Sequence, residues 1–145
     1  MSDAYDVAAE LSQWLAPYIQ GASVAGRRQF SRAVARYLWR SQSARIRDQK
    51  NPDGSPFEKR RRGKSAMFEK IRQRPHLRTG ASDSELWVGF RGRAARIARV
   101  HQEGRTIAPG PGQKTVRYAE RQLLGFTQQD IEQIKSLAET HLLPR

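Results

Sequence analysis

The sequence predicts an α+β fold in which N-terminal helices, one of them long and basic, precede a small antiparallel β-sheet and a C-terminal helix. Three observations support this prediction. Apolar residues recur at helical spacing over roughly the first third of the chain. After Pro75 the spacing changes to alternation, in short β-prone runs between turns. The last amphipathic stretch begins at a capping motif, which indicates a closing helix.

The first helix is expected over residues 3–19, where a helical stripe is formed by Val7, Leu11, Trp14, Leu15 and Tyr18. Pro17 lies late in this stripe and should kink or end the helix, because proline lacks the backbone N–H that a helix needs. Gly21 then interrupts the pattern.

The second helix is expected from about Ser23 to Gln49, with one apolar face and a nearly continuous basic edge. Trp39 and Ile46 project among the arginines of that edge. Either they pack against another part of the same domain, or they contact a second subunit, since Trp and Arg are frequent at interface hot spots. The candidate interface residues on this helix are therefore Arg28, Arg32, Arg36, Trp39, Arg40, Ile46 and Arg47.

A turn and a basic loop follow the long helix. Asn51-Pro52-Asp53-Gly54 has turn chemistry, because Pro presets φ and Gly accepts a positive φ. The next polar run adds Lys59, Arg60, Arg61 and Arg62 to the candidate interface residues. Ser65 to Gln73 is predicted to form a short helix that buries Met67, Phe68 and Ile71.

The sheet region is predicted from short β-prone runs at His76–Thr79, Glu85–Phe90, Val116–Tyr118 and Gln122–Phe126. Ala94 to Gln102 is ambiguous between helix and strand. Thr127 and Asp130 have the spacing of a capping box and predict the start of the last helix.

Length and composition favour one domain. A chain of 145 residues can bury a real core even with a mean hydropathy of −0.79. We expect a single domain over residues 1–145, comprising a helical part (1–50), a basic arm (51–75), the small β-sheet (76–126) and the C-terminal helix (127–142). No apolar run approaches the roughly 20 residues that span a bilayer, so no membrane partner is expected.

The net charge is confined to one stretch of the sequence. Arg27 to Arg78 holds 17 Lys and Arg against four acidic residues, which is the whole formal charge of +13. The remaining 10 basic and 10 acidic residues cancel. Such a chain needs an anionic partner or a charge-balancing assembly, and nucleic acid is the usual first candidate.

Motifs for catalysis or cofactor binding are missing. The chain has no cysteine, and His101-Gln102-Glu103 therefore lacks the downstream cysteines of zinc deaminases. Gly63-Lys64-Ser65 ends like a phosphate-binding loop, but Glu58 stands where the first glycine belongs. We expect no enzyme activity, no metal site and no cofactor. A small nuclease that uses Asp83 and Glu85 is the weakest alternative.

Five segments in order carry a family likeness, namely Arg45–Phe57, Lys64–Arg74, Val88–Gly92, Arg96–Gly104 and Val116–Phe126. Over about residues 25–142 they resemble the phage virion morphogenesis proteins, which are tail completion proteins of contractile-tailed and Mu-like phages. The sequence departs from the family at Ala119, where proline is frequent, so the start of that strand is expected to differ.

The resemblance implies a structural protein of the virion neck, without catalytic residues, that makes tails competent for head–tail joining. It implies a homo-oligomeric ring, expected to hold about six copies by analogy with related tail components. The implied partners are the connector, tail terminator and tail tube, and the implied locations are the neck of the virion and, during assembly, the host cytoplasm.

The basic arm is expected to bind neighbouring proteins, with at most non-specific contact to DNA in the channel. DNA must slide through the channel during ejection, and tight phosphate binding by every arginine would hinder its passage. The alternative is a free nucleic-acid-binding protein, whose affinity for duplex DNA would fall steeply with salt.

Overall fold

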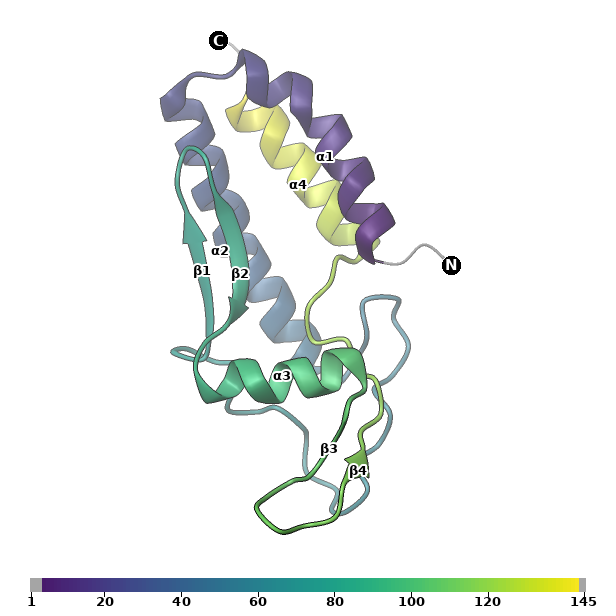
Figure 1. Ribbon diagram of the computed structural model, residues 1–145. Helices are drawn as coiled ribbons and strands as arrows, with labels where there is room; N and C mark the ends of the chain where they lie inside the picture. Colours follow the sequence, from purple (N-terminus) through teal and green to yellow (C-terminus); the bar gives the residue numbers. More distant parts are fainter. Residues whose placement is uncertain (1–3, 144–145) are drawn as a thin grey trace. The chain divides into compact units, whose positions relative to one another are not determined.

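The α+β class is confirmed by a computed structural model that describes residues 4–143, with side chains described from Leu11 onward (Figure 1). The described elements, in chain order, are α1 (Ala4–Gly21), α2 (Val24–Arg47), β1 (Leu77–Ala81), β2 (Leu86–Phe90), α3 (Arg93–Glu103), β3 (Thr106–Ile107), β4 (Val116–Arg117) and α4 (Gln128–His141). They form two compact units. The first comprises the described parts of residues 1–41, 79–88 and 126–145, and the second comprises residues 42–78 and 89–125.

The core of the first unit lies between helices. Its fully or nearly buried side chains come from α1, the first part of α2, α4 and the residue that caps α4. They are Leu11, Phe30, Val34, Leu38, Ile134, Ala138 and Leu142. Figure 1 shows α1 and α4 side by side. The helix does not end at Pro17, as one alternative predicted, but continues to Gly21. Trp14 and Tyr18 stack at 4.6 Å and pack on the core, which holds the turn around the proline in place.

The predicted capping box of α4 is confirmed. Thr127 accepts a hydrogen bond from the Asp130 backbone N–H at 3.0 Å, and the Asp130 carboxylate accepts one from the Thr127 N–H at 3.0 Å. These bonds satisfy two backbone donors at the start of the helix.

Strands β1 and β2 form a hairpin close to the predicted runs, with β1 shifted to Leu77–Ala81. The hairpin turn closes through a bond from the Ser82 N–H to the Glu85 carbonyl at 2.8 Å. Glycine is required at position 80, because the indole of Trp87 lies 2.3 Å from where a Cβ would stand. Leu86 and Val88 pack against the core of the first unit.

The second unit has its own small core, made of Ile46, Phe57, Met67, Ala98 and Leu123. The segment that was ambiguous in the sequence is helix α3. Strands β3 and β4 pair antiparallel over only two residues each, Thr106 with Arg117 and Ile107 with Val116. Much of this unit is therefore irregular chain, and its backbone must find hydrogen-bond partners outside regular structure.

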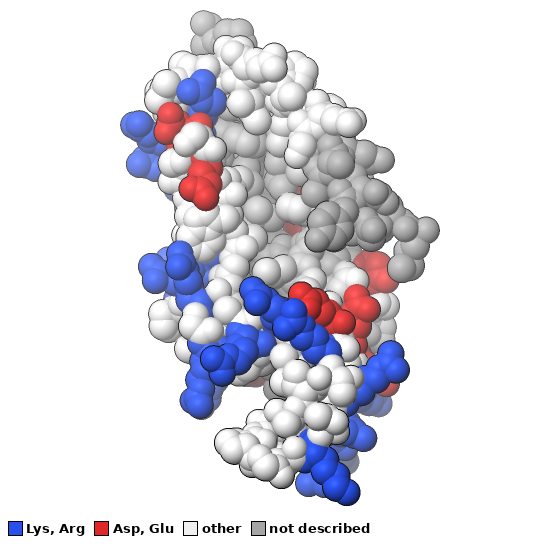
Figure 2. Space-filling view, in the orientation of Figure 1, with Lys and Arg blue, Asp and Glu red and all other residues white. Residues whose placement is uncertain are grey.

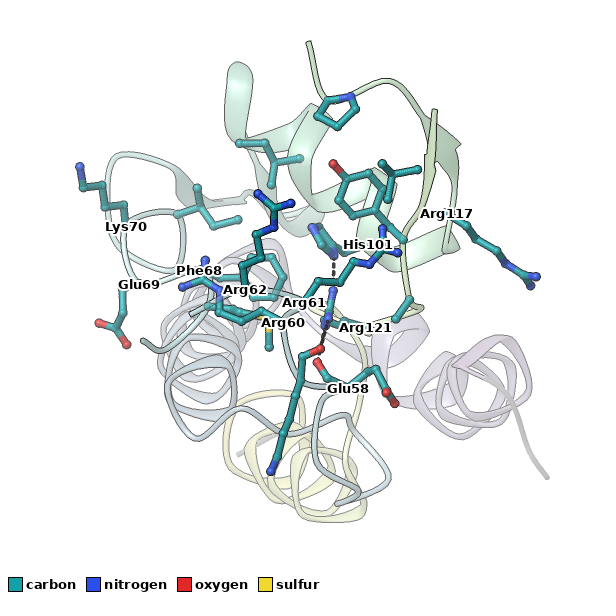
Figure 3. A pocket seen from close by; sticks show the side chains of 18 of the residues that line it. Glu58, Arg60, Arg61, Arg62, Phe68, Glu69, Lys70, His101, Arg117 and Arg121 are labelled. Carbon is teal, nitrogen blue, oxygen red and sulfur yellow. Dashed lines mark hydrogen bonds between the residues drawn. The ribbon is translucent and has the colours of Figure 1, made fainter. Parts of the chain in front are cut away.

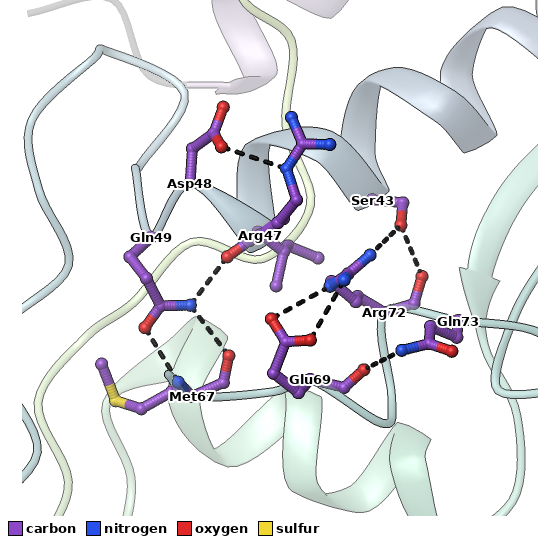
Figure 4. A network of polar contacts seen from close by, with 9 residues as sticks. Ser43, Arg47, Asp48, Gln49, Met67, Glu69, Arg72 and Gln73 are labelled. Carbon is purple, nitrogen blue, oxygen red and sulfur yellow. Dashed lines mark hydrogen bonds and ion pairs between the residues drawn. The ribbon is translucent and has the colours of Figure 1, made fainter. Parts of the chain in front are cut away.

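The predicted helix at Ser65–Gln73 is wrong. The segment forms turns, and Phe68 has a φ of 67°. A reason lies in Gln49, whose side-chain amide donates to the Met67 carbonyl at 2.8 Å and accepts from the Met67 N–H at 2.9 Å (Figure 4). Both backbone groups of Met67 are thus paired outside a helix. Pro75 also prevents a helix from continuing.

The predicted strand at Gln122–Phe126 is also wrong, because side chains take the place of a partner strand. The Gln42 amide bonds the Gly125 carbonyl and N–H at 2.8 and 3.1 Å, and the Gln102 amide bonds those of Leu124 at 2.9 and 3.0 Å. Arg45 donates to the carbonyls of Gln122 and Leu123, both at 2.8 Å. The segment, which bends at Leu123 and Leu124, is therefore held by side-chain hydrogen bonds and belongs to neither of the described sheets.

Candidate partner-binding surface

The two units differ sharply in charge. The second unit holds 20 basic and 6 acidic residues, a net charge of +14, whereas the first holds 7 and 8, a net charge of −1. Figure 2 shows Lys and Arg side chains gathered over α3 and the segments near it. A partner that is attracted by charge will therefore be drawn to the second unit.

The arginine edge of α2 in the first unit is exposed. It comprises Arg28, Arg32, Arg36 and Arg40. Among the described side chains, which begin at Leu11, no ion pair or hydrogen bond engages these four guanidinium groups. Arg27 differs, because it donates to the carbonyls of Asp83 at 3.2 Å and Ala22 at 3.0 Å. The edge is thus available for contacts outside the chain.

The other α2 candidates are placed differently. Arg47 is exposed and pairs with the neighbouring Asp48 at 3.2 Å. Trp39 is half-buried. Ile46 is fully buried in the core of the second unit, which favours the packing interpretation for this residue. A side chain without exposed surface offers nothing to a partner in this conformation.

The run Lys59–Arg62 is exposed, but its start is held in place by Arg121. Arg121 is 5% exposed, and its guanidinium donates to the carbonyls of Glu58 at 2.7 Å and Lys59 at 3.0 Å. Further along, the Arg60 guanidinium donates to the Ser65 hydroxyl at 2.5 Å. The run is therefore a shaped loop whose side chains lie on the surface.

His101 connects this loop to α3. Its ring lies edge-on to Phe68 and Tyr118, with centroids 4.8 and 5.2 Å apart, and its Nδ1 is 3.0 Å from the Arg121 guanidinium. Burial, and then the positive charge of Arg121, lower the pKa of His101 to about 4. The ring is neutral at pH 7, so its unprotonated Nδ1 can accept the bond from Arg121.

These residues surround an open cavity of about 1180 Å³ in the second unit. Its basic lining residues are Lys59, Arg60, Arg61, Arg62, Lys70, Arg117 and Arg121. Its apolar and aromatic lining includes Met67, Phe68, Ile71, Ile97, Pro109, Val116 and Tyr118. Figure 3 shows Lys70 and Arg117 at opposite sides, with Arg60, Arg61 and Arg62 between them. We call this cavity the basic groove.

The structure thus places Lys59, Arg60, Arg61 and Arg62 around one groove with Arg121, Phe68 and Tyr118. The sequence did not mark these last three as candidate interface residues. Arg121 was visible only as part of a segment that resembles the family, and no local pattern marks an arginine that will bond distant carbonyls. Phe68 and Tyr118 could be recognised as aromatic residues near basic ones. Their convergence on His101 depends on how the chain folds.

Among the side chains that the structure describes, no group of three or more His, Cys, Asp or Glu residues is placed to hold a metal ion. Asp83 instead lies 3.9 Å from the Arg27 guanidinium. None of the described helices is both long and apolar enough to cross a membrane.

Comparisons with known proteins give a consistent result. The sequence model of the phage virion morphogenesis family matches residues 6–143. Tail completion protein S of Escherichia phage P2 is 34% identical over 134 residues, which cover 86% of this chain and 89% of that protein. No solved structure matches the chain.

Proposed function

The chain belongs to the phage virion morphogenesis family, and from this premise we propose that it is a tail-completion component of a tailed phage. The observation that carries the proposal is the similarity to tail completion protein S of phage P2 over nearly the whole of both chains. A family of structural phage tail proteins implies a virion component that acts through binding rather than catalysis.

In the finer proposal, the chain acts as one domain that forms a ring of about six copies at the neck and joins tails to filled heads. Its partners are the connector, tail terminator and tail tube, and it is assembled in the host cytoplasm. The exposed arginine edge of α2 and the run Lys59–Arg62 support an assembly role, because both present charge without partners among the described acidic residues.

The test is to produce particles without this protein and to examine them by electron microscopy. The expected result is filled heads beside unattached tails, with joining restored when the wild-type protein is supplied. Normal particles with attached tails would refute the tail-completion role. Substitution of Arg28, Arg32 and Arg36 by Ala should reduce joining if the arginine edge contacts a partner.

Duplex DNA binding is the second candidate function, and the charge of +14 on the second unit favours it. Its signature is an affinity that falls steeply with salt, by a slope that reflects the number of neutralised phosphates. Titration of a duplex at several salt concentrations distinguishes it from the structural role, which requires no such affinity.

A further inference from the structure

We propose that the basic groove is a docking site for an extended acidic segment of a partner protein, one that combines carboxylates with an aromatic or large apolar side chain. The inference deepens the proposed function, because it states the chemistry of one assembly partner. It rests on the charge of the groove, its exposed apolar surface and the way its loop is held.

The lining of the basic groove carries a large excess of positive charge. Seven Lys and Arg side chains face two carboxylates, those of Glu58 and Glu69. The Glu69 carboxylate is already engaged by Arg72, at 3.0 and 3.3 Å. Arg61 and Arg62 are exposed, and their guanidinium groups make no ion pair or hydrogen bond with any side chain or backbone group that the structure describes. The groove therefore offers several cations to a ligand that supplies carboxylates.

The basic groove also holds apolar side chains that are not fully buried. Ile97 lies on α3 and is 43% exposed, so it offers apolar surface to a ligand in the groove. Phe68, Val116 and Tyr118 are half-buried beside it. An aromatic or aliphatic side chain that covers them removes apolar area from water, which a purely charged ligand cannot do.

The loop is also prepared for binding. Arg121 bonds the carbonyls of Glu58 and Lys59, and Arg60 bonds Ser65, so the backbone of the basic run is held in a defined shape. A segment that binds here has less chain to order than it would on a free basic tail. His101 stays neutral and adds no charge to the floor, so it suits an apolar side chain there.

Duplex DNA fits this lining less well. Its phosphates would meet the arginines and lysines but leave Ile97, Phe68 and Tyr118 without apolar partners, because phosphate contacts use polar and basic groups. A peptide with alternating acidic and apolar side chains satisfies both kinds of lining. The groove therefore favours protein over duplex.

The test measures binding of the purified full-length protein to fluorescein-labelled peptides by anisotropy. The probe is a peptide of Glu, Asp and Phe. Two matched peptides replace either its acids by Lys or its Phe residues by Ala, and a duplex DNA oligonucleotide is the competitor. We expect binding of the Glu/Asp/Phe peptide, about tenfold weaker binding of the Ala version and none of the Lys version.

Two matched comparisons distinguish binding in the groove from non-specific attraction of the acidic peptide to the basic protein. Arg61→Glu with Arg62→Glu should weaken the peptide about tenfold or more, whereas Arg28→Glu with Arg32→Glu makes the same change in net charge outside the groove and should have little effect. Ile97→Ser should weaken binding severalfold, and Ile19→Ser, at a similarly exposed position of α1, should not.

Three outcomes overturn the proposal: equal loss in both charge-reversed pairs, equal affinity for the Phe and Ala peptides, or duplex DNA that displaces the peptide from the groove and loses affinity in the groove variants. None of them affects the tail-completion role, which depends on the appearance of particles made without the protein. Conversely, normal particles without the protein would leave the peptide result standing.

Discussion

At the residue scale, Asp130 does more than cap a helix. It is 1% exposed, and its carboxylate accepts from the Tyr37 hydroxyl at 2.9 Å, from the Ser41 hydroxyl and from the Thr127 N–H at 3.0 Å. Burial, and then the bond to this carboxylate, raise the pKa of Tyr37 to about 12. One side chain thus joins α2 to the start of α4 inside the first unit.

Asp130→Ala should lower the free energy of unfolding by about 2–4 kcal/mol, because it leaves three donors without an acceptor, among them the Thr127 N–H of the capping box. Tyr37→Phe removes one donor, the hydroxyl, and leaves no unpaired polar group at position 37. It should lower the free energy of unfolding by about 1 kcal/mol. Urea unfolding followed by circular dichroism measures both. Equal losses in the two variants would contradict the central position of the carboxylate.

His101 gives a prediction for pH. Its pKa is near 4 in the folded protein and near 6.5 in an unfolded chain, so the unfolded state binds more protons between these values. The folded protein should therefore lose stability on acidification from about pH 6.5 to pH 4, on the order of 1 kcal/mol per pKa unit before screening by solvent reduces it. Above pH 6.5 this contribution is constant.

The measurement compares unfolding midpoints of the wild type and His101→Asn across this pH range. The gap between the two proteins should narrow as the pH falls, since Asn does not titrate. A constant gap for His101→Asn would show that the imidazole is not held neutral by its surroundings.

At the element scale, three glutamine side chains form hydrogen bonds with backbone groups that would pair with other backbone groups in a strand or a helix. Gln42, Gln49 and Gln102 each bond both the N–H and the carbonyl of a single distant residue. A primary amide carries one acceptor oxygen and two donor hydrogens, so it matches a peptide group as the edge of a strand does. The segment before α4 is fixed in this way by Gln42 and Gln102.

Gln42→Leu and Gln102→Leu should each lower the free energy of unfolding by about 1–3 kcal/mol. The reason is that the backbone groups of Gly125 in the first variant, and of Leu124 in the second, lose their partners in a partly buried place. Hydrogen exchange of the Leu124 and Gly125 amides should accelerate far more than exchange within α4. Gln133→Leu, on the exposed face of α4, is the matched control. Unchanged protection at Leu124 in Gln102→Leu would rule out the amide as its partner.

These amide pairs also explain which elements the sequence could predict. Helices α2 and α4 follow from local periodicity and a capping box, and the β1–β2 hairpin follows from alternation and turn chemistry. The run Gln122–Phe126 has the composition of a strand, but its partners are side chains that lie far away in the sequence. No local pattern distinguishes a backbone paired by a strand from one paired by glutamines.

At the scale of the whole molecule, the basic residues that are contiguous in Arg27–Arg78 are divided between the two units of the fold. The arginine edge of α2 stays with the first unit, where acidic residues balance it. The basic residues of α3, together with Arg117 and Arg121, join the run Lys59–Arg62 in the second unit. The candidate groove could not be found from the segment alone, because half of its lining comes from outside the segment.

A net charge of +14 on about half of the chain should destabilise the second unit through self-repulsion, and added salt should relieve it. We expect the melting temperature to rise with sodium chloride up to about 0.5 M, where the Debye length falls to roughly 4 Å. Differential scanning fluorimetry at several salt concentrations measures this rise. A fall in melting temperature over this range would contradict the repulsion argument.

The double variant in the groove should therefore be more stable than the wild type and yet bind the acidic peptide more weakly. Arg61→Glu with Arg62→Glu reduces the charge of the second unit from +14 to +10, and at low salt it should raise the melting temperature by about 2–4 °C. Arg28→Glu with Arg32→Glu takes the first unit from −1 to −5 and should give no such gain. A groove variant that is more stable yet binds the acidic peptide more weakly cannot owe its lost affinity to unfolding. If the groove pair instead melts lower than the wild type at low salt, its arginines contribute to the fold itself, and the groove is not a surface kept free for a partner.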